Sequence, residues 1–98
     1  MEKALIFSTD ALEQIQLIWR YIDENLSSQS ADNLLERIDE KVKWIIKNPE
    51  TGYLSEASPQ IRYVLVDKHR RLYYEIGEEL IIVLALFDTR QDPKKRPY

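Results

Sequence analysis

The stretch from Leu80 to Phe87, LIIVLALF, constrains the fold more than any other part of this sequence. It is apolar without alternation, so a β-strand formed here has two apolar faces. Such a strand needs cover on both sides, from helices, from the last residues of the chain or from another protein. The sequence therefore predicts a central strand that is covered on both faces.

The first half of the sequence predicts a strand and two amphipathic helices. Residues 3–7, KALIF, form a short apolar run bounded by Ser-Thr-Asp and are typical of a strand. Ser8 or Thr9 can cap the first helix, and Asn48-Pro49 ends the second. We expect Trp19 and Trp44 to anchor the core or the seam of this helical hairpin. The apolar stripes, at spacings of three and four, are Ala11, Leu12, Ile15, Ile18, Trp19, Ile22 and Leu26, then Ala31, Leu34, Leu35, Ile38, Val42 and Ile45.

The second half predicts a loop and three strands. Residues 48–60 lack apolar periodicity and are expected to form a loop. Strands are expected at residues 61–66, 71–76 and 80–87, and their short connections favour antiparallel pairing. The prediction is a single α+β domain over residues 1–98, with element order βααβββ. It combines a four-stranded sheet, an antiparallel strand meander and a helical hairpin packed on one face.

Composition and charge narrow the classes of function. The chain has no cysteine, so disulfides and thiolate chemistry are excluded, and a reducing, cytoplasmic environment is expected. No signal or membrane-spanning segment, glycine-rich phosphate loop or metal-spaced cluster is visible, so we expect no membrane, cofactor or metal. Residues 1–61 carry 6 Lys/Arg against 11 Asp/Glu, a net charge of −5, whereas residues 62–98 carry 8 against 6, a net charge of +2. The positive end suggests an anionic partner there.

The order of these elements resembles the RelE/ParE superfamily of toxins from type II toxin–antitoxin modules. The similar features are the helical hairpin, an Arg opening the strand after the loop, the strand RLYYEI and the Arg-x-x-Pro ending from Arg90 to Pro93. The resemblance implies a plasmid-stabilisation type toxin that inhibits growth and is neutralised by a cognate antitoxin. Residues near the end of the chain are then expected to contact a partner: Arg90, Asp92, Pro93, Lys94, Lys95 and Arg96.

The superfamily divides on mechanism, and RelE-like members cut mRNA on the ribosome. Matching strand to strand, Arg62, Arg71 and Arg90 fall where those members place phosphate-handling residues. Their forked donors suit the phosphorane transition state, and their adjacent strands predict one cleft. The resemblance implies a second basic residue two positions after Arg62, but Val64 stands there.

Proton transfer is harder to assign, because an arginine with a pKa of about 12.5 is a poor general base. His69 in the DKHR turn and Tyr98 are the candidates for this role. Tyr73 and Tyr74 are expected to be core residues or cross-strand partners instead.

Two functions of different classes remain, and the sequence favours the first. One is a ParE-like toxin that binds an essential target such as DNA gyrase and needs no catalytic residue. The other is a metal-independent endoribonuclease that acts on mRNA at the ribosome. A further alternative is a non-toxic interaction module with the same fold.

Overall fold

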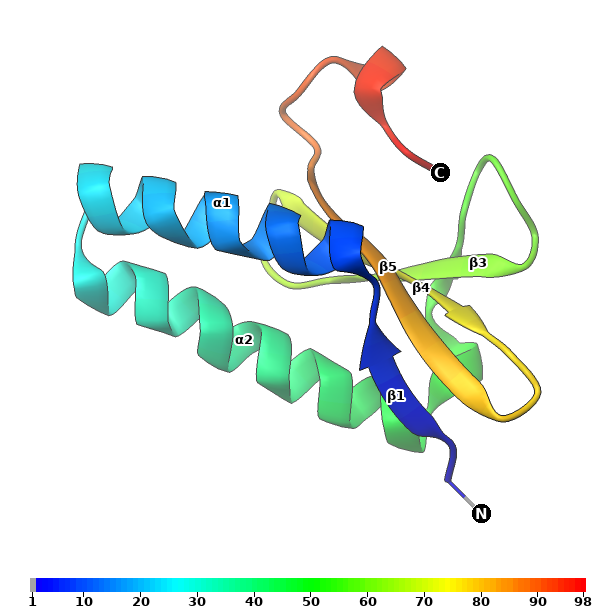
Figure 1. Ribbon diagram of the computed structural model, residues 1–98. Coiled ribbons are helices and arrows are strands. Elements are labelled where there is room, and N and C mark those ends of the chain that lie inside the picture. Colours follow the sequence, from blue (N-terminus) through cyan, green and yellow to red (C-terminus); the bar gives the residue numbers. More distant parts are fainter. Residues whose placement is uncertain (1) are drawn as a thin grey trace.

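The computed structural model of the chain, which describes residues 2–98, confirms the predicted order of a strand, two helices and an antiparallel meander (Figure 1). In chain order the elements are β1 (Ala4–Phe7), α1 (Thr9–Asn25), α2 (Ser28–Lys47), the 3₁₀ turn η1 (Pro49–Thr51), β2 (Tyr53–Leu54), β3 (Ile61–Leu65), β4 (Arg70–Ile76), β5 (Leu80–Asp88) and the 3₁₀ turn η2 (Pro93–Lys95).

The sheet has the strand order β1-β5-β4-β3-β2. β1 pairs in parallel with β5, and β3, β4 and β5 pair antiparallel. β5 therefore has a neighbour on each side, as its apolar sequence predicts. The sheet has five strands instead of the expected four. The additional strand is formed by Tyr53 and Leu54, which lie in the segment predicted as a loop and pair with β3. Two residues carry no detectable alternation, and their pairing depends on β3, which lies further along the chain.

Both helices lie on the same face of the sheet (Figure 1). Ser8 and Ser27 cap them, each side-chain oxygen accepting a backbone N–H at 3.0 Å. Trp19 packs against the core beneath them, but Trp44 is 50% exposed, so its predicted anchoring role is wrong. Across residues 2–98, neither helix has the length and apolar character needed to span a membrane.

The apolar stripes of the two helices are broadly confirmed, with exceptions at their margins. Ile15, Ile22, Leu34, Ile38 and Ile45 are buried in one core cluster that also contains side chains of β4 and β5. Three predicted members are exposed instead: Leu12, Leu26 and Leu35. The apolar stripe is wider than the surface that the sheet offers to the helices.

The other face of the sheet carries a smaller cluster formed by Ile61, Tyr73, Ala85 and Phe87. Tyr73 and Tyr74 are both fully buried, as predicted, and they face opposite sides of the sheet. A β-bulge beside them shifts the register between β4 and β5. No helix covers this second face in the described chain, and its partly buried neighbours include Tyr98.

Candidate functional site

A groove runs along the exposed side of α1. Its floor consists of Leu17, Ile18, Tyr21, Ile22 and Leu26. Four adjoining hollows share these side chains and make one continuous depression, the α1 groove. Leu17 and Tyr21 are 62% and 63% exposed. The α1 groove is therefore an apolar surface that the fold itself leaves uncovered.

The rim of the α1 groove carries more cations than anions. Arg70 and Arg90 are paired there with Asp67 and Asp88. Arg37 and Lys68, at the end near the β3–β4 turn, and Lys95, at the other end, supply the excess positive charge. Apolar burial supplies affinity, while the rim charges select the sign of the incoming side chains. The combination suits an amphipathic segment that carries acidic residues.

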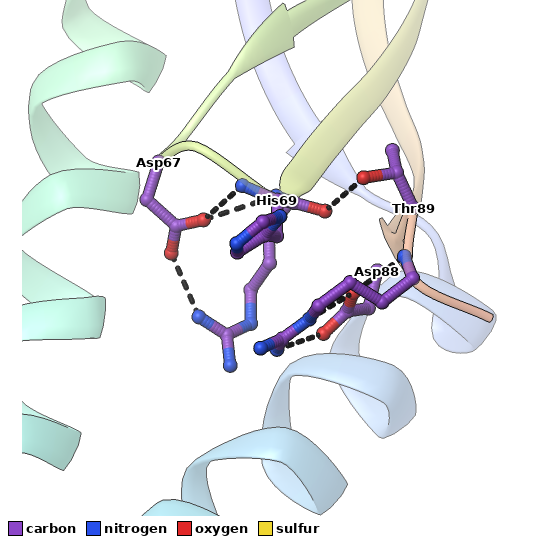
Figure 2. Close-up of polar contacts among 6 residues, drawn as sticks. Asp67, His69, Asp88 and Thr89 are labelled. Carbon is purple, nitrogen blue, oxygen red and sulfur yellow. Dashed lines mark hydrogen bonds and ion pairs between the residues drawn. The ribbon is translucent and has the colours of Figure 1, made fainter.

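The β3–β4 turn at this rim is organised by Asp67 (Figure 2). Its carboxylate accepts hydrogen bonds from the backbone N–H of His69 at 2.9 Å and from Nη1 of Arg70 at 2.7 Å. Burial raises the pKa of Asp67, but these donors outweigh it and hold the pKa below its usual range. The carbonyl of His69 accepts from the backbone and the hydroxyl of Thr89, at 2.7 and 3.0 Å. His69 is thus fixed to the turn through its backbone.

Arg90 is neutralised locally by Asp88. Its Nε and Nη2 donate to the two oxygens of that carboxylate, at 3.0 and 2.5 Å (Figure 2). The side-chain hydrogen bond from Arg90 is the main cause that lowers the pKa of Asp88 to about 2. The two carboxylates here, Asp67 and Asp88, are paired with arginines. Across residues 2–98 no three His, Asp or Glu side chains gather closely enough to hold a metal ion.

The other two predicted arginines lie on opposite faces of the sheet. Arg62 is paired with Tyr74, and its Nη1 donates to the carbonyl of Gly52 at 2.9 Å. Arg71 lies on the other face, with its Cζ 4.1 Å from the centroid of the Tyr63 ring. Arg71 pairs with Leu65, which stands three residues after Arg62 in β3. Side chains an odd number of positions apart in a strand point to opposite faces of the sheet, so Arg62 and Arg71 do too. The expected single cleft of three arginines is therefore wrong.

A row of tyrosine rings crosses the face that Arg71 occupies. Successive ring centroids are 5.4, 5.5 and 5.6 Å apart, at distances typical of aromatic pairs. This surface, the tyrosine face, consists of Tyr53, Tyr63, Tyr73, Tyr98 and Arg71. Nη1 of Arg71 lies 3.2 Å from the hydroxyl of Tyr73. Aromatic and arginine side chains of this kind are frequent at the energetic centre of protein interfaces.

Glu56, in the loop before β3, holds two cations at the edge of the tyrosine face. Its Oε1 accepts from Nη1 of Arg71 at 3.2 Å and lies 3.8 Å from Nη1 of Arg96. A hydrogen bond from its own backbone lowers the pKa of Glu56 first, and Arg71 and Arg96 lower it further. Glu56 therefore stays ionised and links β4 to the end of the chain.

The predicted partner-binding residues near the end of the chain are exposed. Asp92 caps η2, because its Oδ1 accepts the backbone N–H of Lys94 at 3.0 Å. From there the side chains divide. Lys95 lines the α1 groove, whereas Arg96 points to Glu56. The candidate proton donors are likewise separated, since His69 lines the α1 groove and Tyr98 lies on the tyrosine face.

Several of these residues were missed by sequence reasoning. Leu17 and Tyr21 offered a signal, because an apolar side chain outside the core stripe of an amphipathic helix is unexplained by the fold. Glu56 offered none, since its role depends on a loop that brings it to Arg71 and Arg96. The row of tyrosines depends on strand register, which the sequence alone does not specify here.

A family model described as the ParE toxin of the type II toxin–antitoxin system, parDE, matches residues 5–93. The chain belongs to the ParE toxin family. It is thus a type II toxin of the RelE/ParE superfamily, as the order of its elements suggested. A search of curated proteins returns no match.

Solved structures support the fold of this ParE-family chain. A chromosomal ParDE toxin–antitoxin system from P. aeruginosa is 17% identical, with a TM-score of 0.76 over 89% of this chain and 96% of that one. The YoeB dimer from Staphylococcus aureus is 16% identical, with a TM-score of 0.61 over 87% and 94%. The E. coli DinJ–YafQ toxin–antitoxin complex is 9% identical, with a TM-score of 0.66 over 92% and 96%. At these identities the likeness concerns the fold alone.

Proposed function

We propose that this ParE-family toxin inhibits growth by binding an essential protein, DNA gyrase, rather than by cutting mRNA. The observation that carries the proposal is the separation of the three candidate arginines. Arg62 and Arg71 lie on opposite faces of the sheet, and Arg90 is paired with Asp88. Stabilising a phosphorane needs several preorganised donors that converge on one phosphate, and these three side chains do not converge.

The tyrosine face is the proposed target surface. It combines Tyr53, which is 62% exposed, with Tyr63 and Arg71. These residue types contribute much binding free energy per side chain because they bury large areas and lose little conformational entropy. Binding of this kind needs no general base, which agrees with the absence of an assigned one.

A cognate antitoxin is the proposed second partner, and the α1 groove is its proposed site. The ParDE and DinJ–YafQ structures are toxin–antitoxin systems by their descriptions. In this chain the apolar floor at Leu17 and Tyr21 and the basic rim at Arg37 and Lys68 suit an acidic amphipathic segment. The module is then of the plasmid-stabilisation type and acts in the cytoplasm, where its target is found.

A ribosome-dependent endoribonuclease is the second candidate, and one observation favours it. Arg71 lies on the same surface as Tyr63, Tyr73 and Tyr98. A cation with aromatic rings on one face can hold a phosphate and stack a base. This hypothesis uses Arg71 and Tyr98 of the predicted catalytic residues and leaves Arg62, Arg90 and His69 without a role.

The two candidates are separated by assaying one preparation of toxin in two reactions. We expect it to inhibit DNA supercoiling by gyrase and to leave mRNA intact on programmed ribosomes. In cells, expression should cause filamentation with DNA-damage signalling. Codon-positioned cuts that Arg71→Ala abolishes would establish the endoribonuclease instead. Normal growth with abundant folded protein would indicate a non-toxic interaction module.

A further inference from the structure

Arg71, the cation that stacks on the tyrosine face, is largely withdrawn from solvent. Its side chain is 18% exposed, and its Cζ lies 4.1 Å from the centroid of the Tyr63 ring. Burial lowers the pKa of Arg71, but hydrogen bonds to Tyr73 and Glu56 outweigh it and raise the pKa above its usual range. A cation in such a position needs an anionic partner to offset the hydration that it has lost.

Glu56 is the anionic partner of Arg71. Nη1 of Arg71 donates to the two carboxylate oxygens of Glu56, at 3.2 and 3.3 Å, and to the hydroxyl of Tyr73 at 3.2 Å. Among residues 2–98, Glu56 is the one acidic side chain that forms an ion pair with Arg71. The carboxylate thus fixes the guanidinium in one orientation against the Tyr63 ring.

The loop before β3 presents Glu56 in a defined position. The backbone N–H of Ser55 donates to the carbonyl of Ile61 at 2.8 Å, and Oγ of Ser55 accepts the backbone N–H of Ala57 at 3.1 Å. Ser55 is also buried, although its neighbours in the loop are not. Glu56 therefore reaches Arg71 from a stretch of backbone that is held on both sides.

The charges on the tyrosine face balance one another. Glu75 pairs with Ile61 of the cluster on this face, and cross-strand partners share a face. Arg96 lies 3.8 Å from Glu56. Two cations, Arg71 and Arg96, thus stand with two carboxylates, Glu56 and Glu75, and the tyrosine rings add no charge. An anionic partner would have to displace Glu56 before it could pair with Arg71.

We propose that Glu56 is a positioning residue of the tyrosine face and that this face takes an uncharged, apolar segment of its partner. The carboxylate holds Arg71 flat on Tyr63, so the two side chains form a preformed plane whose charge is already neutralised. A partner packs on this plane without the cost of ordering a flexible arginine. The inference rests on the proposed function for the identity of the partner, DNA gyrase, whereas the role of Glu56 concerns the free chain alone.

The positioning role is tested by NMR spectroscopy of the free chain. Side-chain protons of Arg71 that lie over the Tyr63 ring should resonate upfield of those of the exposed Arg20, because of the ring current. Glu56→Ala should move the Arg71 resonances toward the exposed values. Glu79→Ala, the same change in the exposed turn before β5, should leave them in place. Unchanged Arg71 resonances in folded Glu56→Ala would overturn the positioning role, whatever the toxin binds.

The class of partner is tested by the sign of one charge change. Glu56→Gln removes the charge and keeps the shape of the side chain. It should weaken gyrase binding about three- to tenfold, because Arg71 loses its ion pair while still largely buried. Glu79→Gln should bind as the wild type does. Unchanged or stronger binding by Glu56→Gln would refute the proposal, since removal of a carboxylate that competes for Arg71 favours an anionic partner.

A short single-stranded RNA serves as the anionic probe. The wild type should not bind it, whereas gyrase binding should change little between about 50 and 200 mM salt. RNA binding that falls steeply over this range would overturn the assignment of an uncharged partner. A wild-type chain that binds no gyrase contradicts the proposed function alone, because the NMR and RNA measurements still report on Glu56 and on the face.

Discussion

Tyr73 and Tyr74 are neighbours in β4 and equally buried, but the two faces of the sheet that they occupy differ in kind. Tyr74 faces the helices, and its hydroxyl donates to the carbonyl of Pro49 at 2.6 Å. Tyr73 lies on the tyrosine face, where Arg71 and Tyr98 cover it. One face is closed by two helices, whereas the other is covered only by neighbouring side chains and the last residues of the chain. We infer that stability and recognition are divided between the two sides of one sheet.

The largest expected effect is on the side of the helices. Tyr74→Ala should lower the free energy of unfolding by about 3–5 kcal/mol, since a large buried aromatic side chain is removed from the core. Tyr53→Ala, the same chemical change at an exposed edge of the tyrosine face, should cost less than about 1 kcal/mol. Urea denaturation of both variants measures the difference. Similar midpoints would mean that the two faces contribute equally to stability.

A smaller loss is expected at Gly52, which packs on the ring of Tyr74. A Cβ at this position would stand 2.3 Å from the Tyr74 hydroxyl, so the loop or the ring must shift. Gly52→Ala should destabilise the fold by about 1–3 kcal/mol through overpacking. Thermal denaturation checks the value. The combination Gly52→Ala with Tyr74→Phe should recover part of the loss, because the clashing oxygen is absent.

A further, smaller effect is expected in acid. Asp88 has its pKa lowered from 3.8 to about 2 by Arg90, so its contribution to stability is complete above about pH 4 and is lost as the pH falls toward 2. Because Arg90 is largely exposed, the loss should be only about 1–2 kcal/mol. Asp88→Asn should flatten the pH dependence of the urea midpoint in this window. Asp32→Asn, at an exposed position of α2, should not.

The sequence predicted the elements well because their signals are local. The cap at Ser8, the apolar periodicity of the helices and the two-faced strand from Leu80 to Phe87 specify most of the fold. The strand β2 escaped prediction because it exists only through pairing with β3. The parallel pairing of β1 with β5 also joins distant parts of the chain.

The candidate site was less predictable, since it depends on which face each side chain takes. Arg62 and Arg71 are basic residues of adjacent strands, and only the register between the strands separates them. Asp88 and Glu56 decide the partners of Arg90, Arg71 and Arg96, but a carboxylate in a loop or at a strand end gives no sign of its partner.

The most direct test of the central claim, that the two surfaces serve two partners, is to measure growth and antitoxin binding for one variant of each surface. Leu17→Glu puts a negative charge into the α1 groove and should give a toxin that still arrests growth but is no longer rescued, with Leu12→Glu outside the groove as the matched control. Arg71→Ala should give a harmless protein that still copurifies with the antitoxin. Loss of both properties in both folded variants would contradict the account, because a single shared surface would then bind both partners.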